Sequence, residues 1–158
     1  ATLVDNARLK AAAVVEATGL PAIADDTGLF VEGLGGQPGV RSARYAGEGC
    51  TAADNVEKLL TSLSGEAAGS GRAARFVTVA LARWPDGREL VAEGVVLGEI
   101  APSVRGEGGF GYDPVFIPKG SGGRTYAEMG PVEKNDISHR SRAFRALAEM
   151  LVPRESGS

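Results

Sequence analysis

The sequence is nearly devoid of the residues that form disulfides and zinc sites. It contains one cysteine, Cys50, and one histidine, His139, among its 158 residues. A single cysteine cannot form an intrachain disulfide, and these two residues alone cannot complete a zinc site. One free cysteine is also typical of a reducing compartment, so we expect a cytoplasmic protein.

Long apolar runs and blocks of positive charge are missing as well. No run approaches the ~20 apolar residues of a membrane helix, and the start, ATLVDNARLK, carries charges where a secretory signal would be apolar. The 17 Lys and Arg residues are outnumbered by 20 Asp and Glu residues and form no long basic block. We therefore expect neither a nucleic-acid nor a membrane partner, whereas a small anionic ligand held by a few cations fits this composition.

The residues that are abundant indicate a globular domain, which we expect to span residues 1–158. The sequence is 43% hydrophobic, and apolar residues recur at helical spacing in three segments. The first two segments open with Thr-x-x-Asp, a form of the capping box, and the third opens with Ser138, a favourable N-cap. We predict helices within residues 2–21, 51–63 and 138–151.

Strand signals surround these helices. Two long segments joined by Pro-Asp-Gly predict a β-hairpin, and three shorter apolar segments predict further strands. The hairpin arms are residues 73–84 and 88–100, and the shorter strands are residues 22–24, 29–34 and 114–118. The sum predicts an α/β fold in which helices cover a long, partly antiparallel sheet.

The segment DDTGL is the first with chemical potential. Asp25 and Asp26 follow a short apolar run and precede Thr27 and a glycine. Two carboxylates at the end of a strand suit Mg²⁺, and one of them could deprotonate a water molecule. The alternative is a turn in which either carboxylate caps backbone N–H groups.

The segment RGEGGFGYDP is the second. Residues 106–111 satisfy G-x-G-x-x-G, but they run into Tyr-Asp-Pro and a strand, whereas a dinucleotide fingerprint must open a helix. The rings of Phe110 and Tyr112 could stack on a base, and Asp113 could accept hydrogen bonds from it. The alternative is a tight turn with aromatic residues packed in the core.

The segment EKNDISHRSR is the third. His139 lies among Lys134, Arg140 and Arg142, directly after the Ser138 cap. A helix N-terminus favours an anion or an electron-rich edge of a ligand. The alternative is a histidine on a solvated surface, and no Ser-His-Asp order is supported.

Three blocks now carry a resemblance to a known family. They are GLPAIADDTGLFVEGLGGQPGVRSARYAG, GFGYDPVFIP and EKNDISHRSRAF, in order along nearly the whole chain. They resemble the signature blocks of the inosine triphosphate pyrophosphatases, which act on noncanonical purine nucleoside triphosphates. The resemblance implies an elongated α/β fold with a mixed sheet, two lobes and a central nucleotide cleft, usually in a homodimer.

The same resemblance implies an activity and a set of site residues. The activity is Mg²⁺-dependent hydrolysis of inosine, deoxyinosine or xanthosine triphosphate (ITP, dITP, XTP) to the monophosphate and pyrophosphate. Asp26 would be the general base and a metal ligand, with Asp25 as a second metal residue or a support. The residues that would contact substrate are Thr27, Phe110, Gly111, Tyr112, Asp113, Lys134, His139 and Arg140.

Arg140 makes physical sense in such a site. Hypoxanthine and xanthine carry a 6-oxo acceptor where adenine carries a 6-amino donor. A guanidinium aimed at that edge would pair with the former and oppose the latter, and a buried polar mismatch discriminates strongly. Guanine is also a 6-oxo purine, so its rejection would require crowding or unpaired burial at its 2-amino group.

The resemblance also includes a departure. Members of that family begin with a strand and a Ser/Thr-x-x-Asn-x-x-Lys phosphate-binding segment, followed by an acidic residue, and residue 1 of this sequence comes after the position of these features. Asn6 and Lys10 belong to the later helix with a different spacing, so we do not expect them to replace that segment. Two other interpretations therefore stand beside the hydrolase: a truncated nucleotide-binding or dimerisation module, and a broader phosphatase that releases orthophosphate.

Overall fold

A computed structural model describes residues 1–65 and 71–152 of the chain. It contains four α-helices and five strands, connected by loops and short 3-10 turns. In chain order the elements are α1 (Leu3–Thr18), β1 (Ala22–Val31), β2 (Pro38–Gly39), α2 (Ala52–Ser62), β3 (Ala73–Arg83), β4 (Glu89–Ile100), β5 (Phe116–Pro118), α3 (Pro131–Ile137) and α4 (His139–Leu151). None of the described helices is long and apolar enough to cross a membrane.

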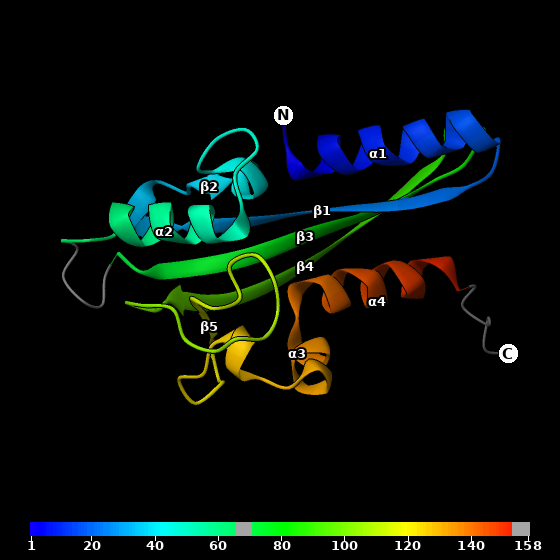
Figure 1. Cartoon of the computed structure of the whole chain (residues 1–158). Coiled ribbons are helices and arrows are strands. Elements are labelled where there is room, and N and C mark those ends of the chain that lie inside the picture. The colour runs from blue at the N-terminus through cyan, green and yellow to red at the C-terminus, as the bar shows by residue number, and fades with distance from the viewer. Residues whose placement is uncertain (66–70, 153–158) are drawn as a thin grey trace, which may run out of the picture.

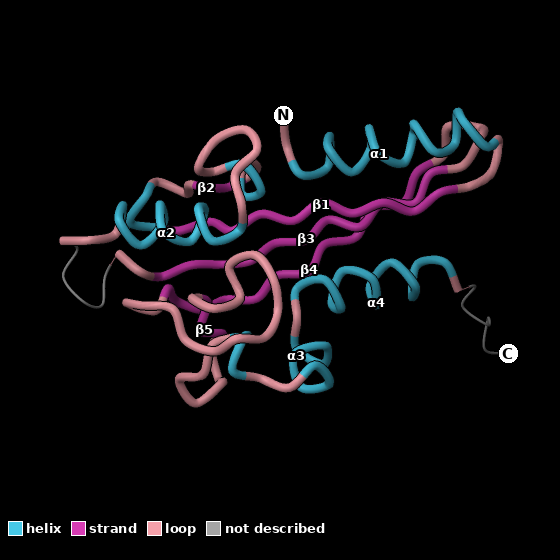
Figure 2. The backbone as a smooth tube through the Cα atoms, viewed as in Figure 1, coloured by secondary structure: helices cyan, strands magenta, loops and turns pink. Residues whose placement is uncertain are grey.

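The strands form one elongated sheet in the order β2-β1-β3-β4-β5. Its centre consists of β1, β3 and β4, which run side by side over most of their length (Figure 2). This arrangement confirms the expected α/β class. All four strand pairings in the described part of the chain are antiparallel, so the parallel pairing that a mixed sheet requires is not among them.

Helices cover both faces of the sheet, with α1 and α4 on opposite sides of the long strands (Figure 1). Alternate residues of β3 point to opposite faces, which explains how one strand packs against both helices. The α1 face is formed by Leu3, Ala7, Ala11, Val77, Val79 and Leu81. The α4 face is formed by Ala80, Ala82, Ala92, Ala143 and Leu147.

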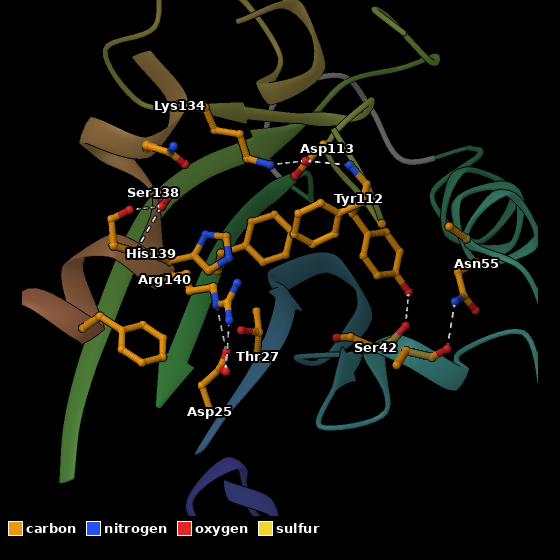
Figure 3. Close-up of a pocket in the computed structure, with 18 of the residues that line it drawn as sticks. Asp25, Thr27, Ser42, Asn55, Tyr112, Asp113, Lys134, Ser138, His139 and Arg140 are labelled. Carbon is orange, nitrogen blue, oxygen red and sulfur yellow. Dashed lines mark hydrogen bonds and ion pairs between the residues drawn. The ribbon is translucent and has the colours of Figure 1, made fainter. Parts of the chain in front are cut away.

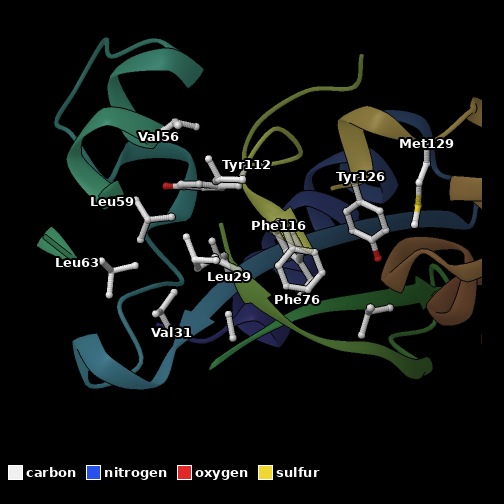
Figure 4. Packing of buried hydrophobic residues seen from close by; sticks show 14 residues of the cluster. Leu29, Val31, Val56, Leu59, Leu63, Phe76, Tyr112, Phe116, Tyr126 and Met129 are labelled. Carbon is white, nitrogen blue, oxygen red and sulfur yellow. The ribbon is translucent and has the colours of Figure 1, made fainter. Parts of the chain in front are cut away.

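The largest hydrophobic cluster lies on the α4 face of the sheet but at its other end, under α2. It joins α2 to the sheet and to the segment after β4, and includes Leu29, Leu59, Phe76, Phe116 and Tyr126 (Figure 4). The α2 packing and the α4 packing are thus two separate clusters on one face. The separation of these two clusters divides this face into a lobe around α2 and a lobe around α4, with room for a cleft between them.

The cap signals in the sequence are confirmed. Thr2 and Asp5 form a complete capping box at the start of α1, which ends at the left-handed Gly19. Thr51 and Asp54 form the same box at the start of α2. Such reciprocal bonds satisfy backbone N–H groups that have no partner inside the helix, and so fix where each helix begins.

Helix α4 starts where the sequence predicts, with the Ser138 hydroxyl accepting a hydrogen bond from the Ser141 amide at 3.1 Å. Gly94 of β4 lets the first turn of this helix approach the sheet. A Cβ at that position would lie 2.0 Å from the carbonyl oxygen of His139 and 2.4 Å from the Ala143 nitrogen. Since both neighbours are backbone atoms, only glycine permits this contact.

The predicted strands at residues 22–24 and 29–34 require correction, and one helix was missed. Residues 22–31 form one continuous strand, not two short strands separated at Asp25 and Asp26, and residues 32–34 form a 3-10 turn and not the end of a strand. Aspartate and glycine are poor strand formers, yet all ten residues of β1 pair with β3, and this ladder overrides their local preference. The short helix α3, which begins at Pro131 directly before α4, was not predicted.

Candidate functional site

A cleft of about 870 Å³ lies on the α4 face of the sheet, between α2 on one side and α3 and α4 on the other. Asp25, Thr27 and Phe76 line it from the strands. Figure 3 shows the side chains of the three sequence blocks pointing toward this common space. The predicted site residues that line the cleft are Asp25, Thr27, Phe110, Gly111, Tyr112, Asp113, Lys134, His139 and Arg140, so Asp26 alone is outside the lining.

Asp113 and Lys134 form a buried ion pair in the wall of the cleft. Their side chains are 5% and 15% exposed, and the Lys134 ammonium donates to Asp113 Oδ2. The same Asp113 oxygen accepts from the Phe110 amide at 2.9 Å, and the Lys134 Nζ lies 4.5 Å from the centre of the Phe110 ring. This network fixes the turn that presents Phe110, with the left-handed Gly111 (φ 58°) completing that turn.

The two aromatic residues of this turn have different environments. Phe110 is 74% exposed, so its ring has a face open to a ligand. Tyr112 is buried, and its hydroxyl donates to the Ser42 carbonyl at 2.7 Å. Burial raises the pKa of this phenol well above its usual range. Tyr112 therefore connects this turn to the 3-10 turn at Ser42–Arg44 and forms a wall of the cleft, while Phe110 is the ring that is free to stack.

His139 is buried and its ring stacks on Phe76, with the ring centres 4.4 Å apart and an interplanar angle of 14°. Burial, followed by the positive charges of Lys134, Arg140 and Arg142, lowers the pKa of His139 from 6.5 to about 4. The imidazole is therefore neutral at physiological pH. Its buried Nδ1 atom has no hydrogen-bond partner among the described residues. The alternative of a histidine on a solvated surface is excluded by this burial.

Asp25 and Asp26 point to opposite faces of β1, because successive side chains of a strand alternate. Asp25 pairs in the ladder with Ala80 on the α4 face, whereas Asp26 pairs with Val79 on the α1 face. Across the cleft, Arg140 Nε donates to Asp25 Oδ2 at 3.2 Å. The two carboxylates therefore do not converge on one point in the cleft, as the sequence had suggested.

On the α1 face, Asp26 is held by two side chains of α1. Lys10 Nζ lies 2.7 Å from Asp26 Oδ1, and Asn6 Nδ2 donates to Asp26 Oδ2 at 2.9 Å. Lys10 also donates to the Asp25 carbonyl at 2.8 Å. These two partners of Asp26 were not predicted from the sequence. The available signal was their spacing, because polar residues four positions apart lie on the same side of a helix.

Thr27 lies on the cleft face of β1, the same face as Asp25. Its hydroxyl shares a 2.7 Å hydrogen bond with the hydroxyl of Thr78, which is fully buried. A hydroxyl can both donate and accept, so Thr27 Oγ1 still has capacity for a bond to a ligand. The threonine is thus fixed in direction and available on the floor of the cleft.

The residues available for a metal ion are few. No three His, Cys, Asp or Glu side chains converge anywhere in residues 1–65 and 71–152. Mg²⁺ commonly uses one or two protein carboxylates and takes its other oxygen ligands from phosphates and water. Asp26 already carries a cationic group on Oδ1, the Lys10 ammonium. Its Oδ2 accepts from the Asn6 amide, so an ion at this carboxylate would use the lone pairs that these two contacts leave free, with substrate oxygen atoms as further ligands.

Comparison with known proteins decides the family. A model described as the Ham1 family matches residues 1–150. The chain belongs to the Ham1 family. The solved Ham1 protein of Staphylococcus aureus has the same fold, with a TM-score of 0.87 and 42% identity over 96% of this chain and 77% of that one. The resemblance to inosine triphosphate pyrophosphatases is thereby confirmed at the level of the family.

Relatives named dITP/XTP pyrophosphatase are also similar to this chain over most of their length. The dITP/XTP pyrophosphatase of Elusimicrobium minutum is 52% identical over 150 residues, which are 95% of this chain and 75% of the relative. That of Thermus thermophilus is 53% identical over 152 residues, or 94% of this chain and 70% of the relative. The matched regions extend over nearly the whole chain and so include the three sequence blocks that meet in the cleft.

Proposed function

We propose that this Ham1 protein hydrolyses noncanonical purine nucleoside triphosphates, those of inosine, deoxyinosine and xanthosine, to the monophosphate and pyrophosphate. Such a reaction would remove these nucleotides from the cellular pool. The observation that carries the proposal is the cleft itself, where an exposed ring, a buried Lys–Asp pair and an arginine face one space beside β1. The designations of the two pyrophosphatase relatives support the same substrates.

The purine is proposed to stack on Phe110, the ring whose face is open to the cleft. Asp113 and Lys134 fix that ring and offer hydrogen-bond groups to the base or sugar. Neutral His139 can donate from one ring nitrogen and accept at the other. Arg140 donates to the 6-oxo group, which inosine and xanthosine carry and adenosine lacks. Gly111 and Tyr112 shape the wall rather than select the base.

The phosphates are proposed to extend from the base toward β1. Thr27 offers a hydroxyl on the floor of the cleft. Asp26, its neighbour in the strand, lies on the opposite face beside the Lys10 ammonium. We propose that the reacting phosphate is bound close to these two residues, which connects the base pocket to a carboxylate that does not line it.

Asp26 is proposed to act as the general base. It would accept a proton from the attacking water while the bond between the α- and β-phosphates breaks and pyrophosphate leaves. Lys10 and Asn6 hold one carboxylate oxygen each, which fixes the direction of the base. Lys10 also supplies a positive charge close to the position of the phosphates.

Mg²⁺ is proposed as the cofactor, with Asp26 and substrate oxygen atoms as its ligands. When bound, such an ion would neutralise phosphate charge and make the attacking water more acidic. Asp25 is not included in this ligand set, because its carboxylate points to the other face of the strand and pairs with Arg140. We also propose a cytoplasmic homodimer, for which the family resemblance is the support.

The test is to identify the products. We expect pyrophosphate release from inosine and xanthosine triphosphates, dependent on Mg²⁺, at a rate at least about a hundredfold above that for adenosine triphosphate. Equal turnover of all purine triphosphates would contradict the selectivity. Orthophosphate as the sole product would indicate the broader phosphatase, and tight binding without turnover would indicate a nucleotide-binding module.

A further inference from the structure

Asp25 is the one acidic residue of the cleft whose role the proposed function leaves open. It lies on the cleft floor, 115 residues from Arg140 in the sequence, and pairs with that arginine across the cleft. We infer that Asp25 is a positioning residue that fixes the direction of Arg140 and thereby contributes to selection of 6-oxo purines. This inference rests on the proposed function and adds a residue to its specificity.

The geometry of the pair leaves part of the guanidinium available. Arg140 Nε lies 3.2 Å from Asp25 Oδ2, and Nη2 lies 3.4 Å from Oδ1. An arginine side chain has five N–H donors in a rigid plane, so a two-point contact on one side leaves about three donors on the other. Arg140 can therefore bind Asp25 and a substrate oxygen at the same time. The pair orients the arginine and does not compete with the substrate.

Arg140 needs such an anchor because little else restrains it. Its side chain is 58% exposed. Besides Asp25, it contacts the ring of Phe144, but the guanidinium carbon lies 5.4 Å from the centre of that ring. Asp25, in contrast, is 25% exposed and belongs to the paired part of β1. A flexible chain held by a fixed carboxylate loses less conformational entropy when it binds a ligand.

The pair also controls which acceptors face the cleft. An aspartate without a partner could accept a hydrogen bond from the 6-amino group of adenine. Bound to Arg140, the Asp25 carboxylate is occupied, and the donors of the arginine face the base instead. One ion pair therefore favours a 6-oxo group and withholds the acceptor that a 6-amino group requires. An ion pair this exposed contributes little to folding stability, so its loss should leave the protein folded.

The experiment measures binding of inosine and adenosine monophosphates by calorimetry, without metal and without turnover. The variants are Asp25→Ala, Arg140→Ala and the double substitution. We expect each single variant to bind inosine monophosphate about tenfold more weakly than the unmodified protein does. If Asp25 acts through Arg140, adding Asp25→Ala to Arg140→Ala should change that affinity by only about twofold.

Asp136→Ala is the matched control. Asp136 also pairs with an arginine of α4, Arg145, at 3.8 Å. Arg145 lines the cleft as Arg140 does, whereas Asp136 itself does not. This variant removes the same charge and should keep the preference for inosine monophosphate. Unfolding curves of all variants would show that the binding changes do not arise from lost structure.

The outcomes separate this inference from the proposed function. Unchanged or tighter inosine monophosphate binding in Asp25→Ala would overturn the positioning role, as would two independent effects that multiply in the double variant. If the unmodified protein shows no preference for inosine over adenosine monophosphate, the proposed base selectivity and this inference both fail. If it shows the preference but releases no pyrophosphate, the hydrolase proposal alone fails.

Discussion

The two faces of β1 carry neighbouring aspartates in different settings. On the α1 face, Asp26 is 17% exposed and both of its oxygen atoms contact side chains of a single helix. On the cleft face, Asp25 faces Arg140, which belongs to a helix at the other end of the chain. The alternation of a β-strand thus places two chemically identical side chains in contact with different partners.

This difference suggests a division of labour within one dipeptide. A carboxylate held by Lys10 and Asn6 is suited to accept a proton in a fixed direction. A carboxylate that orients Arg140 is suited to select the base. Separation on two faces also explains how adjacent acidic residues avoid strong mutual repulsion, because each has its own cationic partner.

The largest expected effect belongs to the α1 face. Asp26→Asn keeps the size of the side chain and an oxygen that can accept from Lys10, but removes the proton acceptor. We expect kcat for inosine triphosphate to fall by about 10²- to 10⁴-fold, with a nearly unchanged unfolding curve. Steady-state pyrophosphate release measures the change, and near-normal turnover would remove Asp26 as the base.

A smaller effect is expected on the cleft face. Phe110→Ala removes a ring that is 74% exposed, so it should cost little stability. Loss of stacking should weaken nucleotide binding by about ten- to a hundredfold, seen as a higher KM with a smaller change in kcat. An unchanged KM would show that the base does not stack on this ring, and the division between the faces would need revision.

A further effect on the cleft face concerns the pH dependence of folding stability. The pKa of His139 falls from 6.5 to about 4 on folding, so between these values the unfolded chain binds a proton that the folded chain does not. The free energy of unfolding should therefore decrease as pH is lowered through this window, by at most about 1.4 kcal/mol per pH unit. His139→Gln lacks the titrating group, so this part of the pH dependence should disappear. Identical slopes for both proteins, measured by urea unfolding, would contradict a buried neutral imidazole.

The sequence predicted the features that depend on neighbouring residues. The capping boxes at Thr2 and Thr51 and the Ser138 cap require only residues a few positions apart. The turn at residues 85–87 likewise indicated the hairpin of β3 and β4. Nine of the ten predicted site residues line the cleft, because the three blocks that carry the family resemblance contain them.

Long-range pairing was the part that the sequence could not supply. Asp25 and Asp26 looked like the end of a strand because the ladder to β3, about 55 positions later, is invisible in local propensity. The contacts of Asp26 with Asn6 and Lys10 span 20 and 16 positions, and that of Asp25 with Arg140 spans 115. The direction of each carboxylate follows from these contacts, and so do their different roles.

The most direct test of the central claim is the ratio of kcat/KM for inosine triphosphate to that for adenosine triphosphate, measured for Asp26→Asn and Asp25→Ala. The division of labour predicts that Asp26→Asn slows both substrates alike and preserves the ratio. It predicts that Asp25→Ala lowers the ratio about tenfold while retaining pyrophosphate release. A changed ratio in Asp26→Asn together with an unchanged ratio in Asp25→Ala would contradict it.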